Sequence, residues 1–303
     1  MSELAIELSQ VTKRFGPKVA VNAISLAIPT GQVYGLIGPN GAGKTTTFSM
    51  MCGFLHPTSG TLKVMGVAPT PPGNLKGKLG ALPQDAILPA GWEIGELLTY
   101  WARLSALPQP EREAREALDK VGLAENWFTP TEALSHGMAK RTAMAQALMG
   151  KPPLVLLDEP TAGLDPRIAA QVRQLIRDMK GQQTVVVSSH NLQELEELCD
   201  AAAIIDKGSI VKAGTMSELT GLGAEFRVQI ARGDVIPPEL TQLPGVTSAR
   251  MESPGVLLVR FDSTAHKPEE VISRTVAHLL QTGVLILGVT RGQRLEDKVL
   301  QIL

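Results

Sequence analysis

The chain has 303 residues, of which 44% are hydrophobic, so it can bury a sizeable core and is not intrinsically disordered. Its 29 Lys and Arg residues nearly balance its 30 Asp and Glu residues, and we therefore expect no charge-driven binding of nucleic acid. At roughly 100 to 200 residues per domain, this length predicts about two domains.

The apolar segments of the chain are short. Runs such as those at 154–157, 256–259 and 284–287 fall far below the roughly 20 residues that cross a bilayer. The N-terminus lacks the basic stretch and apolar core of a secretory signal. Cys52 and Cys199 have no metal-ligand spacing, so we expect two reduced, partly buried thiols. These features predict a cytoplasmic protein without a membrane span.

The region up to about residue 220 begins with strand-like segments. Alternating apolar residues near 5–8 and 24–28 indicate strands that are separated by Gly, Pro and Asn turns. Compact apolar runs at 33–37, 154–157 and 184–187 are typical of strands buried on both faces. Because helical segments lie between these runs, the region is expected to be an α/β domain with a parallel-sheet core.

The first compact strand leads into a phosphate-loop motif. Residues 38–45 match G-x-x-x-x-G-K-[ST] between a predicted strand and a predicted helix, which is the context that the motif requires. The loop's N–H groups are expected to surround phosphate oxygens, while Lys44 neutralises phosphate charge and Thr45 ligates Mg²⁺. A chance glycine-rich turn is the alternative. The predicted nucleotide-binding residues here are Gly38, Pro39, Asn40, Gly41, Ala42, Gly43, Lys44, Thr45 and Thr46.

Residues from about 86 to 150 are rich in Glu, Arg, Ala and Leu and are expected to form a helical subdomain. Trp92 and Trp101 fit either the core of this subdomain or a surface for a partner. Met138, Met144 and Met149 are expected to fill space on a packed helix.

Polar residues follow the later compact strands. Asp158 and Glu159 come directly after the strand at 154–157, and His190 follows the strand at 184–187. The carboxyl ends of parallel strands meet at one sheet edge, where such folds bind ligands. We expect Asp158 to hold Mg²⁺ through water, Glu159 to polarise an attacking water, and His190 to contact the γ-phosphate. Solvated carboxylates and a structural histidine are the alternatives.

The region from about 221 to 303 has a different pattern. Strand-like segments at 226–230, 256–261 and 284–289 combine with a Pro-flanked helix, an apolar helical stripe and a last helix at 294–303. This order resembles βαββαβ and predicts a small α+β, ferredoxin-like domain. We find no catalytic constellation in it.

Together, the motifs in residues 4–220 resemble the nucleotide-binding cassette of ATP-binding cassette (ABC) transporters. Gln84 resembles the Q-loop, residues 134–138 (LSHGM) the signature, residues 163–165 the D-loop, and His190 the switch histidine. The resemblance implies a P-loop NTPase cassette that hydrolyses ATP with Mg²⁺. It also implies that Gln84 is a catalytic and metal-binding residue, and that Phe15, Ser135, Gly137 and Asp165 contact nucleotide.

The family's cassettes pair head to tail, which implies that Ser135 and Gly137 face the γ-phosphate held by Lys44 of a second cassette. The pair could be a homodimer or a dimer with a related subunit. His136 and Met138 depart from the usual Gly and Gln of the signature. We expect the signature to function with His136 pointing away from the γ-phosphate or beside it.

The resemblance further implies a separate integral membrane permease as partner. Residues 221–303 resemble the accessory domain of exporter-type cassettes that work with ABC-2 permeases. We therefore expect an ATPase that powers export and is peripheral on the cytoplasmic face of the membrane, with no nucleic-acid partner. A soluble ABC ATPase acting on ribosomes or DNA, or an importer subunit, is the alternative. The apolar candidates for docking the permease are Ile87, Leu88, Trp92, Ile94, Leu97 and Trp101.

Overall fold

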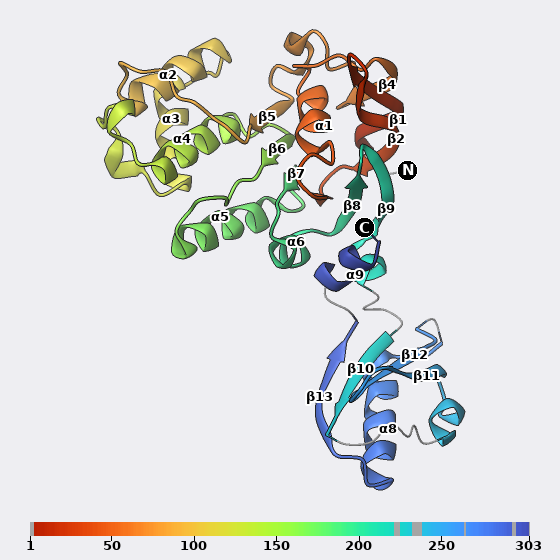
Figure 1. Ribbon diagram of the computed structural model, residues 1–303. Helices are drawn as coiled ribbons and strands as arrows, with labels where there is room; N and C mark the ends of the chain where they lie inside the picture. Colours follow the sequence, from red (N-terminus) through yellow and green to blue (C-terminus); the bar gives the residue numbers. More distant parts are fainter. Residues whose placement is uncertain (1–2, 221–224, 232–237, 264, 293–294, 303) are drawn as a thin grey trace. The chain divides into compact units, whose positions relative to one another are not determined.

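The computed structural model describes residues 3–220, 225–231, 238–263, 265–292 and 295–302. The chain divides into two compact units, Met1–Ala213 and Gly214–Leu303 (Figure 1). The second unit thus begins before residue 221, where the sequence pattern places the start of the C-terminal domain. The short helix α7 (Met216–Thr220) belongs to this unit because it contacts the last helix, α9 (Leu295–Ile302).

The first unit contains two sheets and two groups of helices. Its elements, in chain order, are β1 (Leu4–Phe15), β2 (Lys18–Pro29), β3 (Val33–Ile37), α1 (Lys44–Met51), β4 (Ser59–Val64), β5 (Leu79–Leu82), α2 (Ile94–Leu104), α3 (Pro110–Lys120), α4 (His136–Leu148), β6 (Leu154–Asp158), α5 (Pro166–Met179), β7 (Thr184–Ser188), α6 (Leu192–Leu198), β8 (Ala201–Asp206) and β9 (Ser209–Thr215).

A sheet in the order β5-β6-β7-β3-β8-β9 forms the centre of this unit. The pairs β5–β6, β6–β7, β7–β3 and β3–β8 are all parallel. Every residue of β3, β6 and β7 is buried, as their unbroken apolar sequences predict. Strands β8 and β9 are joined by Lys207 and Gly208, whose φ angles of 46° and 81° are typical of a tight hairpin turn.

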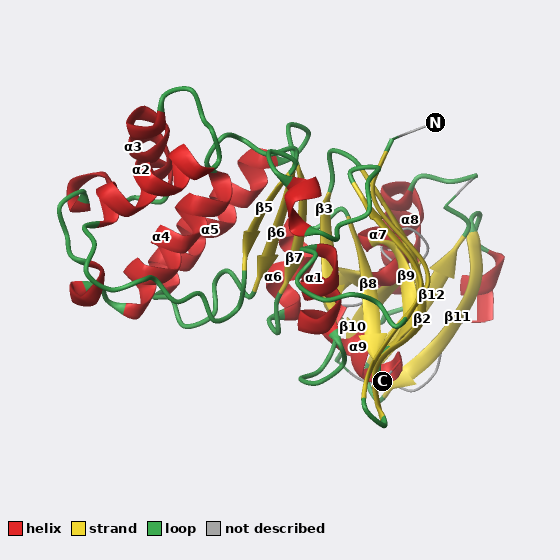
Figure 2. Ribbon diagram, turned by 90° about the horizontal axis from the view of Figure 1, so that it is seen from above, coloured by secondary structure: helices red, strands yellow, loops and turns green. Residues whose placement is uncertain are grey.

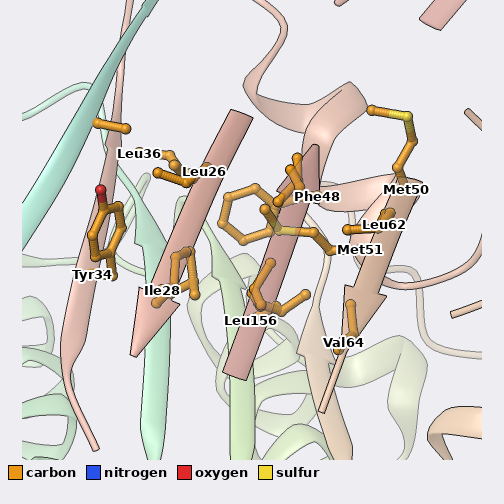
Figure 3. Close-up of a cluster of buried hydrophobic side chains, with 14 of the residues drawn as sticks. Leu26, Ile28, Tyr34, Leu36, Phe48, Met50, Met51, Leu62, Val64 and Leu156 are labelled. Carbon is orange, nitrogen blue, oxygen red and sulfur yellow. The ribbon is translucent and has the colours of Figure 1, made fainter. Parts of the chain in front are cut away.

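Both faces of the parallel sheet are covered. On one face, α1 and the antiparallel sheet in the order β2-β1-β4 enclose an apolar core, and Figure 3 shows Phe48 and Met51 of α1 among side chains from both sheets. On the other face, α6 packs closely against Gly35 of β3. A Cβ atom at Gly35 would lie 3.2 Å from the sulfur of Cys199, so this position favours glycine.

Helices α2, α3 and α4 form the helical subdomain beside the β5 edge of the sheet (Figure 2). Ile94 and Leu97 are buried between these helices, which corrects their assignment as surface residues for a permease. They occupy the apolar face that α2 packs against α3. Ile87, by contrast, is 89% exposed, and Trp92 and Trp101 are partly buried.

The second unit contains β10 (Glu225–Ile230), β11 (Val246–Ser253), β12 (Val256–Phe261), α8 (Pro268–Gln281) and β13 (Ile286–Arg291) in an antiparallel sheet ordered β11-β12-β10-β13. This strand order is that of a ferredoxin-like fold. The described residues between β10 and β11 hold only a 3-10 helix, Pro238–Gln242, where the sequence predicts a full helix. The N-terminal part of that segment lies outside the described residues.

We predict that Leu156→Ala lowers the free energy of unfolding of the first unit by about 2–5 kcal/mol, because this β6 side chain is fully buried in the apolar core between the parallel sheet and α1. Ile87→Ala, at an exposed site, is the control and should change it by less than about 0.5 kcal/mol. Urea unfolding followed by circular dichroism measures both. Equal stability of the two variants would contradict the described core.

Candidate functional site

The phosphate-loop motif lies at the carboxyl edge of the parallel sheet. Strand β3 ends at Ile37 and α1 begins at Lys44, so residues 38–43 form the loop between them. A Cβ atom at Gly38 would lie 2.3 Å from the carbonyl oxygen of Ile205, which leaves no space for a side chain. Gly43 has φ of 109°, and its Cβ would lie 2.6 Å from the carbonyl oxygen of Ala20. The motif's glycines are therefore required by close backbone packing and by backbone conformation.

Lys44 is the buried cation of this loop. Its side chain is 7% exposed, and its ammonium group donates hydrogen bonds to the carbonyl oxygens of Gly38 at 2.6 Å and Pro39 at 3.2 Å. Burial lowers the pKa of Lys44, and the nearby carboxylates of Glu159 and Asp158 oppose that shift. Neutral carbonyl groups compensate an ammonium charge poorly. The loop is therefore suited to an anionic ligand such as a nucleotide phosphate.

A cavity of about 580 Å³ opens at this edge. Nine residues predicted from the sequence line it, and the contributing elements are β6, α1 and the loops after β3 and β5. These residues are Asn40, Gly41, Gly43, Lys44, Thr45, Thr46, Gln84, Asp158 and Glu159.

Four lining residues were not predicted as site residues. Lys18, Val19 and Ala20 come from the start of β2, and Lys207 comes from the β8–β9 turn. The turn is held beside the phosphate loop because the Gly208 N–H donates to the carbonyl oxygen of Ala42. One sequence signal could have found Lys207, namely its position directly after a strand of the parallel sheet.

Oxygen-bearing side chains gather next to Lys44. The Thr45 hydroxyl lies 3.5 Å from Oε1 of Gln84. Asp158 is buried and accepts a short hydrogen bond from the Ser188 hydroxyl, and burial raises the pKa of its carboxyl group. Hydroxyl, amide and carboxylate oxygens are ligands that Mg²⁺ prefers together with substrate phosphates. No cluster of three or more His, Cys, Asp or Glu in the described part of the chain could hold a metal ion by itself.

Glu159 and His190 contact each other across neighbouring strand ends. His190 Nδ1 lies 2.8 Å from Oε2 of Glu159, although the imidazole is 69% exposed. Glu159 has φ of 54°, a strained conformation for a residue other than glycine. Its N–H group donates to the carbonyl oxygen and the hydroxyl of Ser188. This backbone geometry directs the Glu159 carboxylate into the cavity that Lys44 lines.

The signature and D-loop residues do not line this cavity. Ser135 caps α4 by accepting from the Met138 N–H at 3.2 Å, and Asp165 caps α5 by accepting from the Arg167 N–H at 2.8 Å. His136 packs against the D-loop, since a Cβ at Gly163 would lie 3.2 Å from His136 Nε2. Ser135 and Asp165 are exposed. Within one chain, these groups are separate from the phosphate loop.

The remaining predicted residues do not line the cavity. Gly38, Pro39 and Ala42 belong to the phosphate loop, and Gly38 and Pro39 present carbonyl oxygens to Lys44. Phe15, at the end of β1, is exposed, and the Lys13 ammonium group lies 5.1 Å from its ring centroid. Gly137 packs beside Leu164.

Comparison with known proteins shows the family of this chain. A family model described as ABC transporter matches residues 21–162. The linearmycin resistance ATP-binding protein LnrL of Bacillus subtilis (strain 168) is 32% identical over 277 residues, covering 90% of this chain and 89% of that protein. The chain belongs to the ABC transporter family. It is therefore an ATP-binding cassette protein and an ATPase.

Other ABC proteins agree with this assignment. The Nod factor export ATP-binding protein I of Sinorhizobium fredii (strain NBRC 101917 / NGR234) is 33% identical, covering 99% of this chain and 86% of that protein. A solved structure described as an ATP-binding subunit of an ABC transporter has a TM-score of 0.67 at 24% identity. It covers 72% of this chain and 92% of that one. This likeness confirms the predicted α/β cassette fold.

No helix among the described residues combines the length and the apolar sequence that a membrane span requires.

We predict that Lys44→Ala weakens ATP binding about tenfold to a hundredfold, because charge-assisted hydrogen bonds contribute about 1.5–3 kcal/mol. Lys63→Ala, an exposed lysine on β4, is the control and should bind ATP normally. Isothermal titration calorimetry measures both affinities. Normal ATP affinity of a folded Lys44→Ala protein would contradict the phosphate-loop assignment.

Proposed function

We propose that this chain is the ATP-hydrolysing subunit of an exporter, acting through a separate ABC-2 type membrane permease. The observation that carries the catalytic part is the Glu159–His190 contact of 2.8 Å beside the cavity that holds Lys44. The export part is supported by the names of the relatives, which describe antibiotic resistance and Nod factor export.

The phosphates of ATP are bound by N–H groups of residues 40–46 and by the Lys44 ammonium group, which exchanges its carbonyl partners for phosphate oxygens. Thr45 and Gln84 would hold Mg²⁺ directly and Asp158 would hold it through water, and the bound ion would neutralise phosphate charge. Phe15, exposed at the end of β1, stacks on the adenine.

Hydrolysis depends on the carboxylate and the imidazole at the strand ends. Glu159 accepts a hydrogen bond from the attacking water and orients it toward the γ-phosphate. His190 is exposed enough to rotate from Glu159 to the γ-phosphate oxygens, where it stabilises the developing negative charge. Gln84 lies beside Thr45, and its position changes when the γ-phosphate is bound.

A complete site requires a second cassette. Ser135, Gly137 and Asp165 do not line the cavity of their own chain, and Ser135 and Asp165 are exposed. In a head-to-tail pair they complete the site of the partner, whether a second copy or a related subunit. His136 packs against Gly163 and so leaves Ser135 and Gly137 free to face the phosphate.

The permease docks on the helical subdomain beyond Gln84. Ile87 is exposed close to Gln84 in sequence, and Trp92 and Tyr100 stack with ring centroids 5.2 Å apart on α2 and its N-terminal loop. This arrangement supports a peripheral position on the cytoplasmic face of the membrane. The relatives' names favour export over import. The near-neutral net charge of -1 argues against the alternative of a soluble ATPase acting on ribosomes or DNA.

We predict that Glu159→Gln retains ATP binding but lowers kcat by about 10²–10⁴, because the amide no longer acts as a general base. Gel filtration with ATP and Mg²⁺ should then show a trapped dimer. Glu197→Gln, an exposed carboxylate on α6, is the control and should hydrolyse ATP normally. Undiminished hydrolysis by Glu159→Gln would contradict the catalytic assignment.

We also predict that tagged Glu159→Gln protein, expressed in its native host and solubilised in mild detergent with ATP and Mg²⁺, co-purifies with a polytopic membrane protein in stoichiometric amount. Lys44→Ala is the matched control, because it does not hold the ATP-bound dimer and should recover less of that partner. Mass spectrometry identifies the partner. Recovery of ribosomes or DNA instead would favour the soluble-ATPase alternative.

A further inference from the structure

A buried carboxylate on α6 has no role in the site described above. Glu194 is only 5% exposed, although it lies four residues after the exposed His190. Its Oε2 atom accepts hydrogen bonds from the Thr161 hydroxyl at 2.8 Å and the Ser189 hydroxyl at 3.1 Å. Its N–H group donates to Oδ1 of Asn191 at 3.1 Å, which begins the helix. One oxygen atom thus joins two segments that are distant in sequence.

The second oxygen of this carboxylate is poorly compensated. Glu194 Oε1 has no hydrogen-bond partner among the described residues, and the nearest cation, Nη1 of Arg173, lies 3.9 Å away. Removing a carboxylate from water costs free energy unless hydrogen bonds satisfy both oxygens. Burial of this carboxylate therefore costs free energy of folding. A contribution to stability does not explain why a glutamate lies at this position.

Both segments joined by Glu194 belong to the site. Ser189 directly precedes His190, and Thr161 lies between Glu159 and the D-loop, residues 163–165. The connection also reaches the signature helix, because the buried Lys140 of α4 donates to the carbonyl oxygen of Ala162 at 3.0 Å. Ser135 caps the same helix. A displacement of His190 can therefore reach Ser135 through direct contacts and one rigid helix.

We infer that Glu194 is a positioning residue for ATP hydrolysis, which holds Thr161 and Ser189 together so that the backbone segments carrying Glu159, His190 and the D-loop move together. The inference rests on the proposed catalytic roles of Glu159 and His190. Movement of His190 onto the γ-phosphate displaces Ser189, and Glu194 transmits that displacement to Thr161. The D-loop and, through Lys140, the signature helix then follow.

Kinetics of the full-length protein test this inference. Glu194→Ala should lower kcat by about tenfold to a hundredfold, the effect of losing a charge-assisted hydrogen bond during turnover, with ATP affinity unchanged within about twofold. Glu194→Gln retains a carbonyl oxygen that can accept from both hydroxyls but loses the negative charge, and it should recover part of the activity. Glu197→Ala, exposed on the same helix, is the matched control and should keep full activity.

A double-mutant cycle tests the pair itself. Thr161→Val should lower kcat to the same extent as Glu194→Ala, and the double variant should be no slower than either single variant, because each substitution breaks the same link between Thr161 and Ser189. Additive losses would overturn the inference. Full activity of Glu194→Ala would also overturn the inference. A fall in ATP affinity and thermal stability large enough to account for the lost activity of Glu194→Ala would overturn it as well. If Glu194→Ala does not fold, the kcat and ATP affinity of Glu194→Gln and Thr161→Val test the inference by the same criteria.

Glu159→Gln in the same assay separates this inference from the proposed function. If Glu159→Gln is inactive while Glu194→Ala is fully active, the carboxylate does not position the site and only this inference fails. If Glu159→Gln remains active, the proposed catalytic site fails, and the positioning role that rests on it fails as well.

Discussion

The site depends on one constraint, the burial of parallel strands on both faces. Hydrogen bonds align β3, β6 and β7 in parallel, so their carboxyl ends reach the same edge of the sheet. The chain must leave each buried strand there, and the polar residues that follow gather at that edge. Lys44, Glu159 and His190 are brought together in this way. The loops at this edge bind phosphate, provide acid–base chemistry and contact the γ-phosphate. All three depend on the parallel alignment of the buried strands.

The edge also carries charges that the side chains and backbone around them compensate incompletely. Lys44 is satisfied by backbone carbonyl oxygens, Asp158 by the Ser188 hydroxyl, and Glu194 by two hydroxyl groups on one of its oxygens. A phosphate group compensates the Lys44 charge better than carbonyl groups do. Because these charges lie close together, a ligand that changes one of them changes the field at the others. The site is organised for a highly charged substrate rather than for maximal stability.

Local sequence patterns predicted most of the cassette. The phosphate loop, the acidic pair and the buried strands follow from short motifs, because each depends on residues adjacent in sequence. The same patterns erred where a helix face had to be assigned. Ile94 and Leu97 have apolar side chains that suit either a docking surface or a core, and packing against α3 makes them core residues. The helix expected between β10 and β11 is only a 3-10 turn in the described residues.

The amino-acid sequence by itself determined the family, the cassette fold and the chemical groups at the ends of the buried strands. Only the tertiary structure decided which of these groups touch. Glu159 meets His190, and Glu194 joins Thr161 to Ser189, across separations of up to 33 residues. These contacts depend on strand order and register, which arise from packing of the whole domain. Short-range periodicity contains no information about them, so the buried link through Glu194 became visible only in three dimensions.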